Sequence, residues 1–244
     1  MSVVLTVVRR ELRSYFVTPV AWVFSAIFLI LAGALTFYLG HFYARGQADL
    51  QPFFEFHPWL YLFLVPALSM QLWAEERKSG TMELLLTLPL TSTQAMLGKF
   101  LAAWVFVALV LMLTFPLWLT VNYLGQPDNG VILAGYVGSW LMAGAYLAVG
   151  CCLSTLTRSQ VVAFVLTAAV CFILLLAGQP LVMDAASGLL PASWVQGVAD
   201  LSFLSHFAAI ARGVLDVRDV IYFVASIVAW LAAGIVMLNL RRAG

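Results

Sequence analysis

Charged residues are scarce in this chain: they make up 9% of its 244 residues, whereas 64% are hydrophobic. Soluble globular domains carry about 25% charged and about 45–50% apolar residues. With so few charges, a fold of this size could not cover its surface against water, so a water-soluble protein is excluded. The mean hydropathy of +1.01 points to lipid as the medium for most of the chain. The net charge of +1 gives no electrostatic basis for binding nucleic acid.

The sequence also lacks the common catalytic motifs. A phosphate-binding G-x-x-x-x-G-K-[ST] loop is missing, because Gly98-Lys99 is followed by Phe100 and Thr93 stands where the first glycine belongs. Neither H-E-x-x-H nor G-x-S-x-G occurs. We therefore expect no catalytic residues, no ATP hydrolysis by the chain itself and no cofactor bound to it.

Metal-binding and redox residues are few and scattered. The histidines, His41, His57 and His206, stand far apart, so we expect no shared metal site and place the first two at the membrane interface. Disulfide frameworks need paired cysteines in exposed loops. All three cysteines lie in apolar runs and are interpreted as small buried hydrophobic residues: Cys151, Cys152 and Cys171.

Long apolar runs are abundant. A helix needs about 20 apolar residues to cross the roughly 30 Å hydrocarbon core. Six runs reach or approach this length: 20–39, 59–73, 100–124, 131–153, 161–183 and 220–240. The second is short and contains Pro66, so it either extends back toward Phe53 or spans a thinned bilayer. No linker divides the chain, which predicts a single all-α integral membrane domain over residues 1–244 with six transmembrane helices.

The centres of these runs contain no ionisable residue, although proton-coupled transporters and intramembrane acid–base enzymes require them. Both classes are therefore disfavoured. The polar residues within the runs are mild, and we expect them to make hydrogen bonds between helices. They are Ser69, Gln71, Thr114, Thr120, Asn122, Ser139 and Thr167.

The positively charged residues set the predicted topology. One side of the membrane receives nine of them: Arg9, Arg10, Arg13, Arg77, Lys78, Lys99, Arg158, Arg241 and Arg242. The other side receives three: Arg45, Arg212 and Arg218. By the positive-inside rule both termini face the cytoplasm. A cleaved signal peptide ending near Ala34 is the alternative, but the apolar run continues through Leu39, so we expect the first span to be retained.

The segment 2–18 reads as an amphipathic helix. Leu5, Val8, Leu12 and Tyr15 recur at helical spacing and form an apolar face. We expect this helix to lie in the headgroup layer with its arginines near anionic lipid and to end before Pro19. The arginines are Arg9, Arg10 and Arg13. The alternative is a simple basic end that only fixes topology.

The segment 75–99 carries the sharpest local signals. Gly80 permits a break after the second span, Pro89 stops any helix before it, and Thr91 with Gln94 predicts a capping box for the next helix. The stretch 81–88 between these stops would form a helix only about 12 Å long. It holds a methionine and four leucines, so it must bury against something. Either it folds back onto its own bundle or the lipid interface, or it docks into another protein.

The outer segment 184–219 alternates apolar stretches with breaks at Gly188, Pro191 and Gly197. This pattern predicts short helices in the outer leaflet between the fifth and sixth spans.

One motif resembles a known family. It comprises Glu76, Ser79-Gly80-Thr81, Glu83-Leu84-Leu85, Thr87, Pro89-Leu90-Thr91 and Gly98-Lys99. Together these residues resemble the cytoplasmic signature of ABC transporter permeases of the type-2 exporter class. The resemblance implies that 81–88 is the coupling helix, which docks in a groove of a separate ATPase subunit. The contact positions it implies are Gly80, Thr81, Glu83, Leu84, Leu85 and Pro89.

Two further stretches resemble parts of such permeases. Residues 10–16, followed by Pro19, look like the family's elbow helix. Residues 205–207, 212–216 and 222–223 look like the gliding-motility (Gld-type) subgroup. Gliding itself is not implied.

The family implies a complex in the cytoplasmic (inner) membrane. Two permease subunits, identical or different, assemble with two ABC ATPase subunits that hold ATP and Mg²⁺, and the complex exports a substrate. The sequence does not identify that substrate. The alternative is a scaffold or mechanotransmission subunit that passes ATPase motion to an extracytoplasmic auxiliary protein without moving a solute. Both readings need the same coupling helix, since ATP can bias the membrane domain only through contacts that differ between its states.

Overall fold

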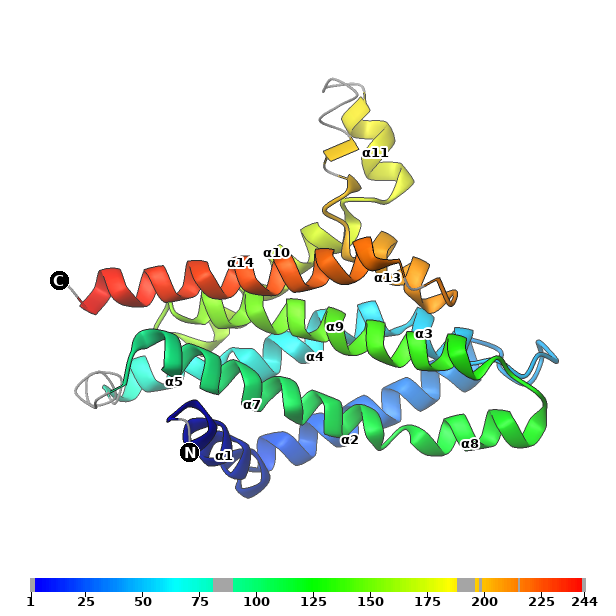
Figure 1. Ribbon diagram of the computed structural model, residues 1–244, viewed down its shortest axis with the longest axis horizontal. Helices are drawn as coiled ribbons and strands as arrows, with labels where there is room; N and C mark the ends of the chain where they lie inside the picture. The colour runs from blue at the N-terminus through cyan, green and yellow to red at the C-terminus, as the bar shows by residue number, and fades with distance from the viewer. Residues whose placement is uncertain (1–2, 81–89, 188–195, 198, 215, 243–244) are drawn as a thin grey trace.

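The computed structural model describes residues 3–80, 90–187, 196–197, 199–214 and 216–242. The described part of the chain is helical, without a strand. Most helices run lengthwise in one bundle, with α1 (Val3–Val17) crossing its edge (Figure 1). The central helix is α9 (Asn129–Ser154), which contacts α4 (His57–Ser69), α7 (Ser92–Met112), α10 (Gln160–Leu176), α13 (Phe203–Ala211) and α14 (Val217–Arg242).

Glycines on α9 allow its neighbours to come this close. A Cβ atom at Gly135 would lie 2.5 Å from Phe54 Cε2, and one at Gly144 would lie 2.7 Å from Trp104 Nε1. Small residues let helix backbones and large side chains meet directly where lipid supplies no hydrophobic drive for association. The stretch 141–152 of α9 is buried throughout, so this helix forms the axis of the bundle.

Four helical segments are long and apolar enough to cross a membrane. They are Ala21–Leu39, Ser92–Leu124, Asn129–Ser154 and Val217–Leu240. The first combines α2 (Pro19–Ala34) with the π-helix η1 (Leu35–Leu39), and the second combines α7 with α8 (Phe115–Leu124). These segments confirm a multi-pass helical membrane protein and match four of the six predicted spans.

The predicted second span corresponds to α4 followed by α5 (Gln71–Ser79). Pro66 lies inside α4 and does not interrupt this helix. Met70 joins α4 to α5 with helical backbone angles, and its N–H donates to the Pro66 carbonyl oxygen at 2.9 Å. Bundled helices tolerate proline when neighbouring groups satisfy the freed backbone atoms. The helix also begins before residue 59, and α3 (Gln51–Glu55) precedes it.

The predicted fifth span is shorter than expected. Its helix α10 ends at Leu176, not at Met183, and α11 (Pro180–Ser187) then points away from the bundle (Figure 1). Pro180 has no N–H to donate to the Leu176 carbonyl, which favours an end of α10 here, and the same proline begins α11. The short helices predicted for 184–219 are represented by α11, which starts earlier than expected, and by α13. Residues 188–195 lie outside the described part.

All three cysteines are buried and free, as predicted.

Candidate functional site

The two helix boundaries predicted around the signature segment are present. Gly80 ends α5 in the left-handed conformation at φ +74°. Thr91 caps α7: its Oγ1 accepts from the Gln94 N–H at 3.2 Å, and its own N–H donates to Gln94 Oε1 at 3.1 Å. Gly80 is therefore placed, and the other implied contact residues lie outside the described ranges: Thr81, Glu83, Leu84, Leu85 and Pro89. Their contact with an ATPase stays a prediction.

Close to these two helix boundaries, a lysine is buried in the bundle. The Nζ atom of Lys99, on α7, lies 2.7 Å from Glu76 Oε1 and 3.6 Å from Glu11 Oε2. Its side chain is only 4% exposed, and Nζ also lies 5.4 Å from the centre of the Trp73 ring. Burying an ammonium group without partners is very costly, so such a charge is kept only where carboxylates surround it. One cation thus joins α1, α5 and α7.

The N-terminal helix packs along α7. Its Val7 side chain fills the space over Gly98, where a Cβ would lie 2.5 Å from Val7 Cγ1. Tyr15 stacks on Phe106 with ring centres 5.2 Å apart. The predicted apolar face is partly wrong: Leu5 is exposed and Val7 is buried in its place, because the notch at Gly98 selects which side of α1 faces the bundle.

The predicted arginines lie on the exposed side of α1: Arg9, Arg10 and Arg13. Arg10 Nη2 pairs with Glu11 Oε1 at 2.5 Å. Glu11 thus receives a surface cation on one oxygen and the buried Lys99 on the other.

A cavity of about 290 Å³ separates α1 from α5. Glu11 and Tyr15 line it from α1, Thr18 from the α1–α2 junction, Gln71 and Glu76 from α5, and Lys99 from α7. Burial raises the pKa of Tyr15 above its usual value, so this hydroxyl stays neutral. The helices α1 and α5 are thus connected, at the edge of this cavity, through their ion pairs with Lys99.

The last turn of α5 is tied to the central helix. Arg77 Nη1 donates to the Thr155 carbonyl oxygen at 2.8 Å, at the end of α9 where a positive charge is favourable. The Gln160 amide at the start of α10 donates to the Glu75 carboxylate. Hydrogen bonds thus join the last turns of α5 to the adjoining ends of α9 and α10.

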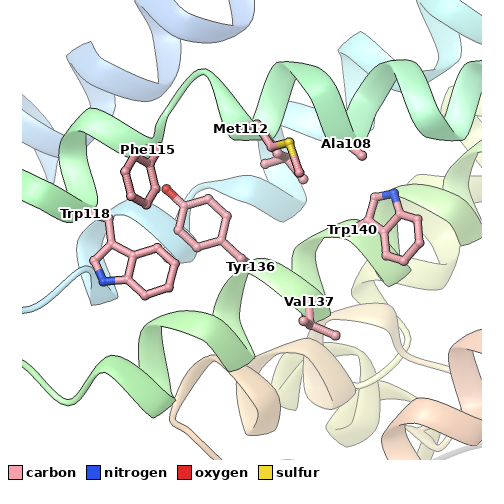
Figure 2. A pocket seen from close by; sticks show the side chains of 8 residues that line it. Ala108, Met112, Phe115, Trp118, Tyr136, Val137 and Trp140 are labelled. Atoms are coloured by element: carbon pink, nitrogen blue, oxygen red, sulfur yellow. The ribbon is translucent and has the colours of Figure 1, made fainter.

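An apolar groove of about 700 Å³ opens between the α7–α8 bend and α9, and Figure 2 shows aromatic rings around it. It is lined by Ala108, Leu111, Met112, Phe115, Trp118, Tyr136, Val137 and Trp140. Its polar atoms already have partners. Tyr136 shares a hydrogen bond with Thr114 Oγ1 at 2.9 Å, and Trp118 Nε1 donates to Asn129 Oδ1 at 2.7 Å. The groove therefore offers apolar contact alone.

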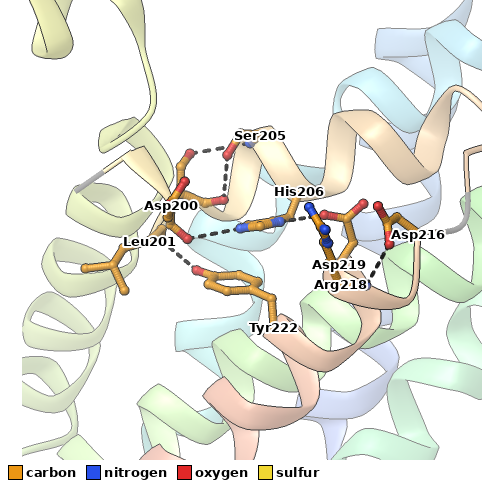
Figure 3. Close-up of polar contacts among 9 residues, drawn as sticks. Asp200, Leu201, Ser205, His206, Asp216, Arg218, Asp219 and Tyr222 are labelled. Carbon is orange, nitrogen blue, oxygen red and sulfur yellow. Dashed lines mark hydrogen bonds and ion pairs between the residues drawn. The ribbon is translucent and has the colours of Figure 1, made fainter. Parts of the chain in front are cut away.

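A polar cluster lies at the end of the bundle opposite α1 and α5, and Figure 3 shows its contacts. His206 Nδ1 lies 2.6 Å from Asp219 Oδ1, and Nε2 lies 3.0 Å from the Asp200 carbonyl oxygen. The ring stacks on Tyr222 at 3.9 Å between centres, and the Tyr222 hydroxyl donates to the Leu201 carbonyl at 2.5 Å. Both ring nitrogens of His206 therefore have an oxygen partner. The start of α14 thereby holds residues 200–201.

His57, which we predicted at the membrane interface, is fully buried inside the bundle. It stacks against Phe28 and Tyr61 and meets Phe53 edge-on at 4.4 Å, because α3 folds over the start of α4. His41 is exposed. Among the described residues, no three His, Cys, Asp or Glu side chains lie close enough together to hold a metal ion.

Apolar helices of membrane-spanning length, with charged residues gathered at the bundle ends, define a multi-pass helical membrane protein. The family model of the ABC-2 family transporter protein matches residues 5–241, nearly the whole chain. The chain belongs to this family and is an ABC transporter permease, a membrane subunit without an ATPase site of its own. Permeases of this family generally work with an ABC ATPase partner. No curated protein sequence matches the chain.

Proposed function

We propose that this permease couples ATP hydrolysis by a separate ABC ATPase subunit to export of a substrate across the cytoplasmic membrane. The observation that carries the proposal is the connection of the α5 and α7 ends, on either side of 81–89, to α1 and α9 through Lys99 and Arg77. ATP and Mg²⁺ belong on the partner, and this chain forms one domain that binds no cofactor. A second permease subunit, identical or different, completes the membrane part.

The proposed topology has six crossings with both termini in the cytoplasm. The α4–α5 pair runs over residues 57–79 and would be about 34 Å long, enough to cross. The 17 residues of α10 would span about 26 Å, which requires local thinning of the bilayer. The ends of α5, α9 and α14 lie at the same end of the bundle as α1 (Figure 1), in keeping with the positive-inside rule. We also propose membership of the gliding-motility subgroup, from the resemblance alone.

The proposed mechanism is a linkage between two sites. Closure of the ATPases displaces 81–88, and the displacement passes through Arg77 to the end of α9 and through Glu76 to Lys99. ATP biases the bundle only insofar as these contacts differ between its states.

The first experiment is purification of the chain from its native membrane in mild detergent, with mass spectrometry of the proteins that accompany it. We expect a stoichiometric soluble ATPase that carries the phosphate loop missing here. A cysteine introduced by Glu83→Cys should crosslink to that ATPase, whereas Thr93→Cys, on the exposed start of α7, serves as the matched control. Absence of an ATPase in both the purification and the crosslinking overturns the proposal.

Measuring ATP hydrolysis by the reconstituted complex distinguishes transport from mechanotransmission. Export predicts that a solute or lipid substrate raises ATP hydrolysis by the reconstituted complex. Stimulation by an extracytoplasmic protein alone would favour the scaffold alternative.

A further inference from the structure

We propose that the apolar groove beside the α7–α8 bend is a binding site for one acyl chain of a membrane phospholipid. The groove lies between two segments of membrane-spanning length, Ser92–Leu124 and Asn129–Ser154. The inference goes beyond the proposed function, because it concerns a lipid that completes the folded permease and holds whichever partner drives the complex.

The groove is a built feature of the fold. The α7 helix ends at Met112 and α8 begins at Phe115, so the chain bends at the two residues between them. The Thr114 hydroxyl donates to the Leu111 carbonyl oxygen at 2.6 Å and shares a hydrogen bond of 2.9 Å with the Tyr136 hydroxyl on α9. The bend is thereby fixed to the opposite wall, and the groove keeps its shape without a ligand.

Stacked aromatic rings bound the groove at both ends (Figure 2). At one end Trp118 stacks on Tyr136, with ring centres 5.7 Å apart. At the other end Trp140 stacks on Trp104 at 4.1 Å, and each indole Nε1 donates to the backbone carbonyl oxygen of the other residue, at 2.8 and 3.2 Å. These hydrogen bonds occupy the polar atoms of the rings.

Water is a poor occupant for such a groove. An enclosed water needs about two to four polar partners, and dry apolar cavities take up apolar molecules instead. The N–H of Trp118 and the hydroxyl of Tyr136 already have protein partners. The occupant is therefore apolar.

The groove is continuous with the surface that contacts lipid. Met112 and Phe115 line the groove and are also exposed, and so are Leu113 and Leu119 beside them. This rim belongs to a segment of membrane-spanning length, so phospholipid chains surround it. An acyl chain can enter the groove sideways from the bilayer.

The charges around the groove indicate which part of the lipid is recognised. Among the described residues that line it, none is charged. Sites that select anionic headgroups carry clusters of lysine or arginine. The groove therefore recognises the chain, and its occupancy should not depend on the headgroup.

The shape of the lining favours a flexible chain over a helix of a second copy. Helices approach each other closely in membranes where small residues face them. Apart from Ala108, the described lining consists of large side chains, and Met112 and Phe115 project at the rim. A chain of methylene groups can follow such a curved wall and gain dispersion contacts on several sides. The volume of about 700 Å³ is within the range of about 300–1,000 Å³ that is usual for small-molecule sites.

The experiment is photolabelling in liposomes. The full-length permease, with the partners that accompany it in purification, is reconstituted with phosphatidylethanolamine or phosphatidylglycerol that carries a diazirine midway along one chain. Ala108→Phe places a ring in the groove, and Ala229→Phe makes the same change at an exposed position of α14 as the matched control. Val137→Phe blocks the groove from α9 and is used if Ala108→Phe does not accumulate.

In the wild type we expect mass spectrometry to find the label concentrated on the peptides that contain Met112 and Tyr136, well above the exposed surface around Val228. Ala108→Phe should lose most of this groove label, and Ala229→Phe should keep it. The two lipids should label the groove equally. Labelling of the groove no stronger than that of α14, or unchanged in both groove variants, overturns the inference. A strong preference for one headgroup overturns it as well.

A crosslinking measurement tests the other occupant. Met112→Cys places a thiol on the exposed rim, while the native cysteines are buried. A bifunctional thiol reagent should leave this variant as single chains. Efficient linkage of two copies through position 112 would assign the groove to a second copy and overturn the inference. None of these measurements depends on ATP hydrolysis, so their failure leaves the proposed function untouched.

Discussion

The imidazole of His206 on α13 and the carboxylate of Asp219 on α14 form a close pair, with 2.6 Å between Nδ1 and Oδ1. Because the other ring nitrogen faces the Asp200 carbonyl, this histidine joins α13 both to the start of α14 and to the residues just before α13. The pair thus links α13 to the start of α14.

Replacing His206 with Phe should lower stability. Phe preserves the stack on Tyr222 but leaves Asp219 and the Asp200 carbonyl without this donor, at a cost of about 1–3 kcal/mol. For a chain of this length we expect a fall in melting temperature of about 2–4 °C for each kcal/mol, measured on detergent-purified protein. Ser205→Ala, on the exposed side of the same turn, is the control. An unchanged melting temperature for His206→Phe would show that the cluster does not hold the segment.

Gly80 should tolerate Asn better than Ala. Its φ of +74° costs a residue with a side chain roughly 1–2 kcal/mol, less for Asn, and no atom of the described residues lies within 4 Å of an added Cβ. Chemical or thermal unfolding of Gly80→Ala and Gly80→Asn tests this order. Equal stabilities would mean that the left-handed cap is absent in the membrane-embedded protein.

Gly98→Ala should displace α1. The new methyl group would meet Val7, and overpacking of this kind costs about 1–3 kcal/mol. Val7→Ala removes the nearest methyl groups, so the double variant should lose less stability than the sum of the single ones. Strict additivity in such a double-mutant cycle would argue against contact between these two residues.

The groove should be open to acyl chains. Trp118 and Trp140 line it, so lipids brominated on their chains should quench tryptophan fluorescence more strongly in the wild type than in the Trp118→Phe, Trp140→Phe double variant. The comparison variant is Trp22→Phe, which removes an exposed tryptophan of α2 that lies outside the groove. Similar quenching in the groove variant and the wild type would place the groove away from lipid.

Much of the fold could be predicted because its signals are local. Apolar runs of membrane-spanning length predicted the long helices. Gly80 and the Thr91–Gln94 capping box predicted two helix boundaries, because each of these boundaries depends on only a few neighbouring residues. The extent of the second span was harder to predict, because tolerance of Pro66 depends on neighbouring helices rather than on the sequence around it.

The ion network could not be predicted from spacing alone. Glu11, Glu76 and Lys99 lie 65 and 23 positions apart, and only packing brings them together. One signal was present: Lys99 lies two turns inside an apolar helix, where an unpaired ammonium would be too costly. The buried face of α1 depended likewise on a notch in another helix, at Gly98.

The enclosure of α9 over residues 141–152 has a mechanical consequence. Neighbouring helices leave this part of α9 little room to bend, so we expect it to transmit a displacement as a stiff rod. Thr155, which accepts the Arg77 hydrogen bond, and Tyr136, which lines the groove, are two points on that rod about 28 Å apart. A small turn of the rod at its charged end would therefore reshape the aromatic groove without any other moving part.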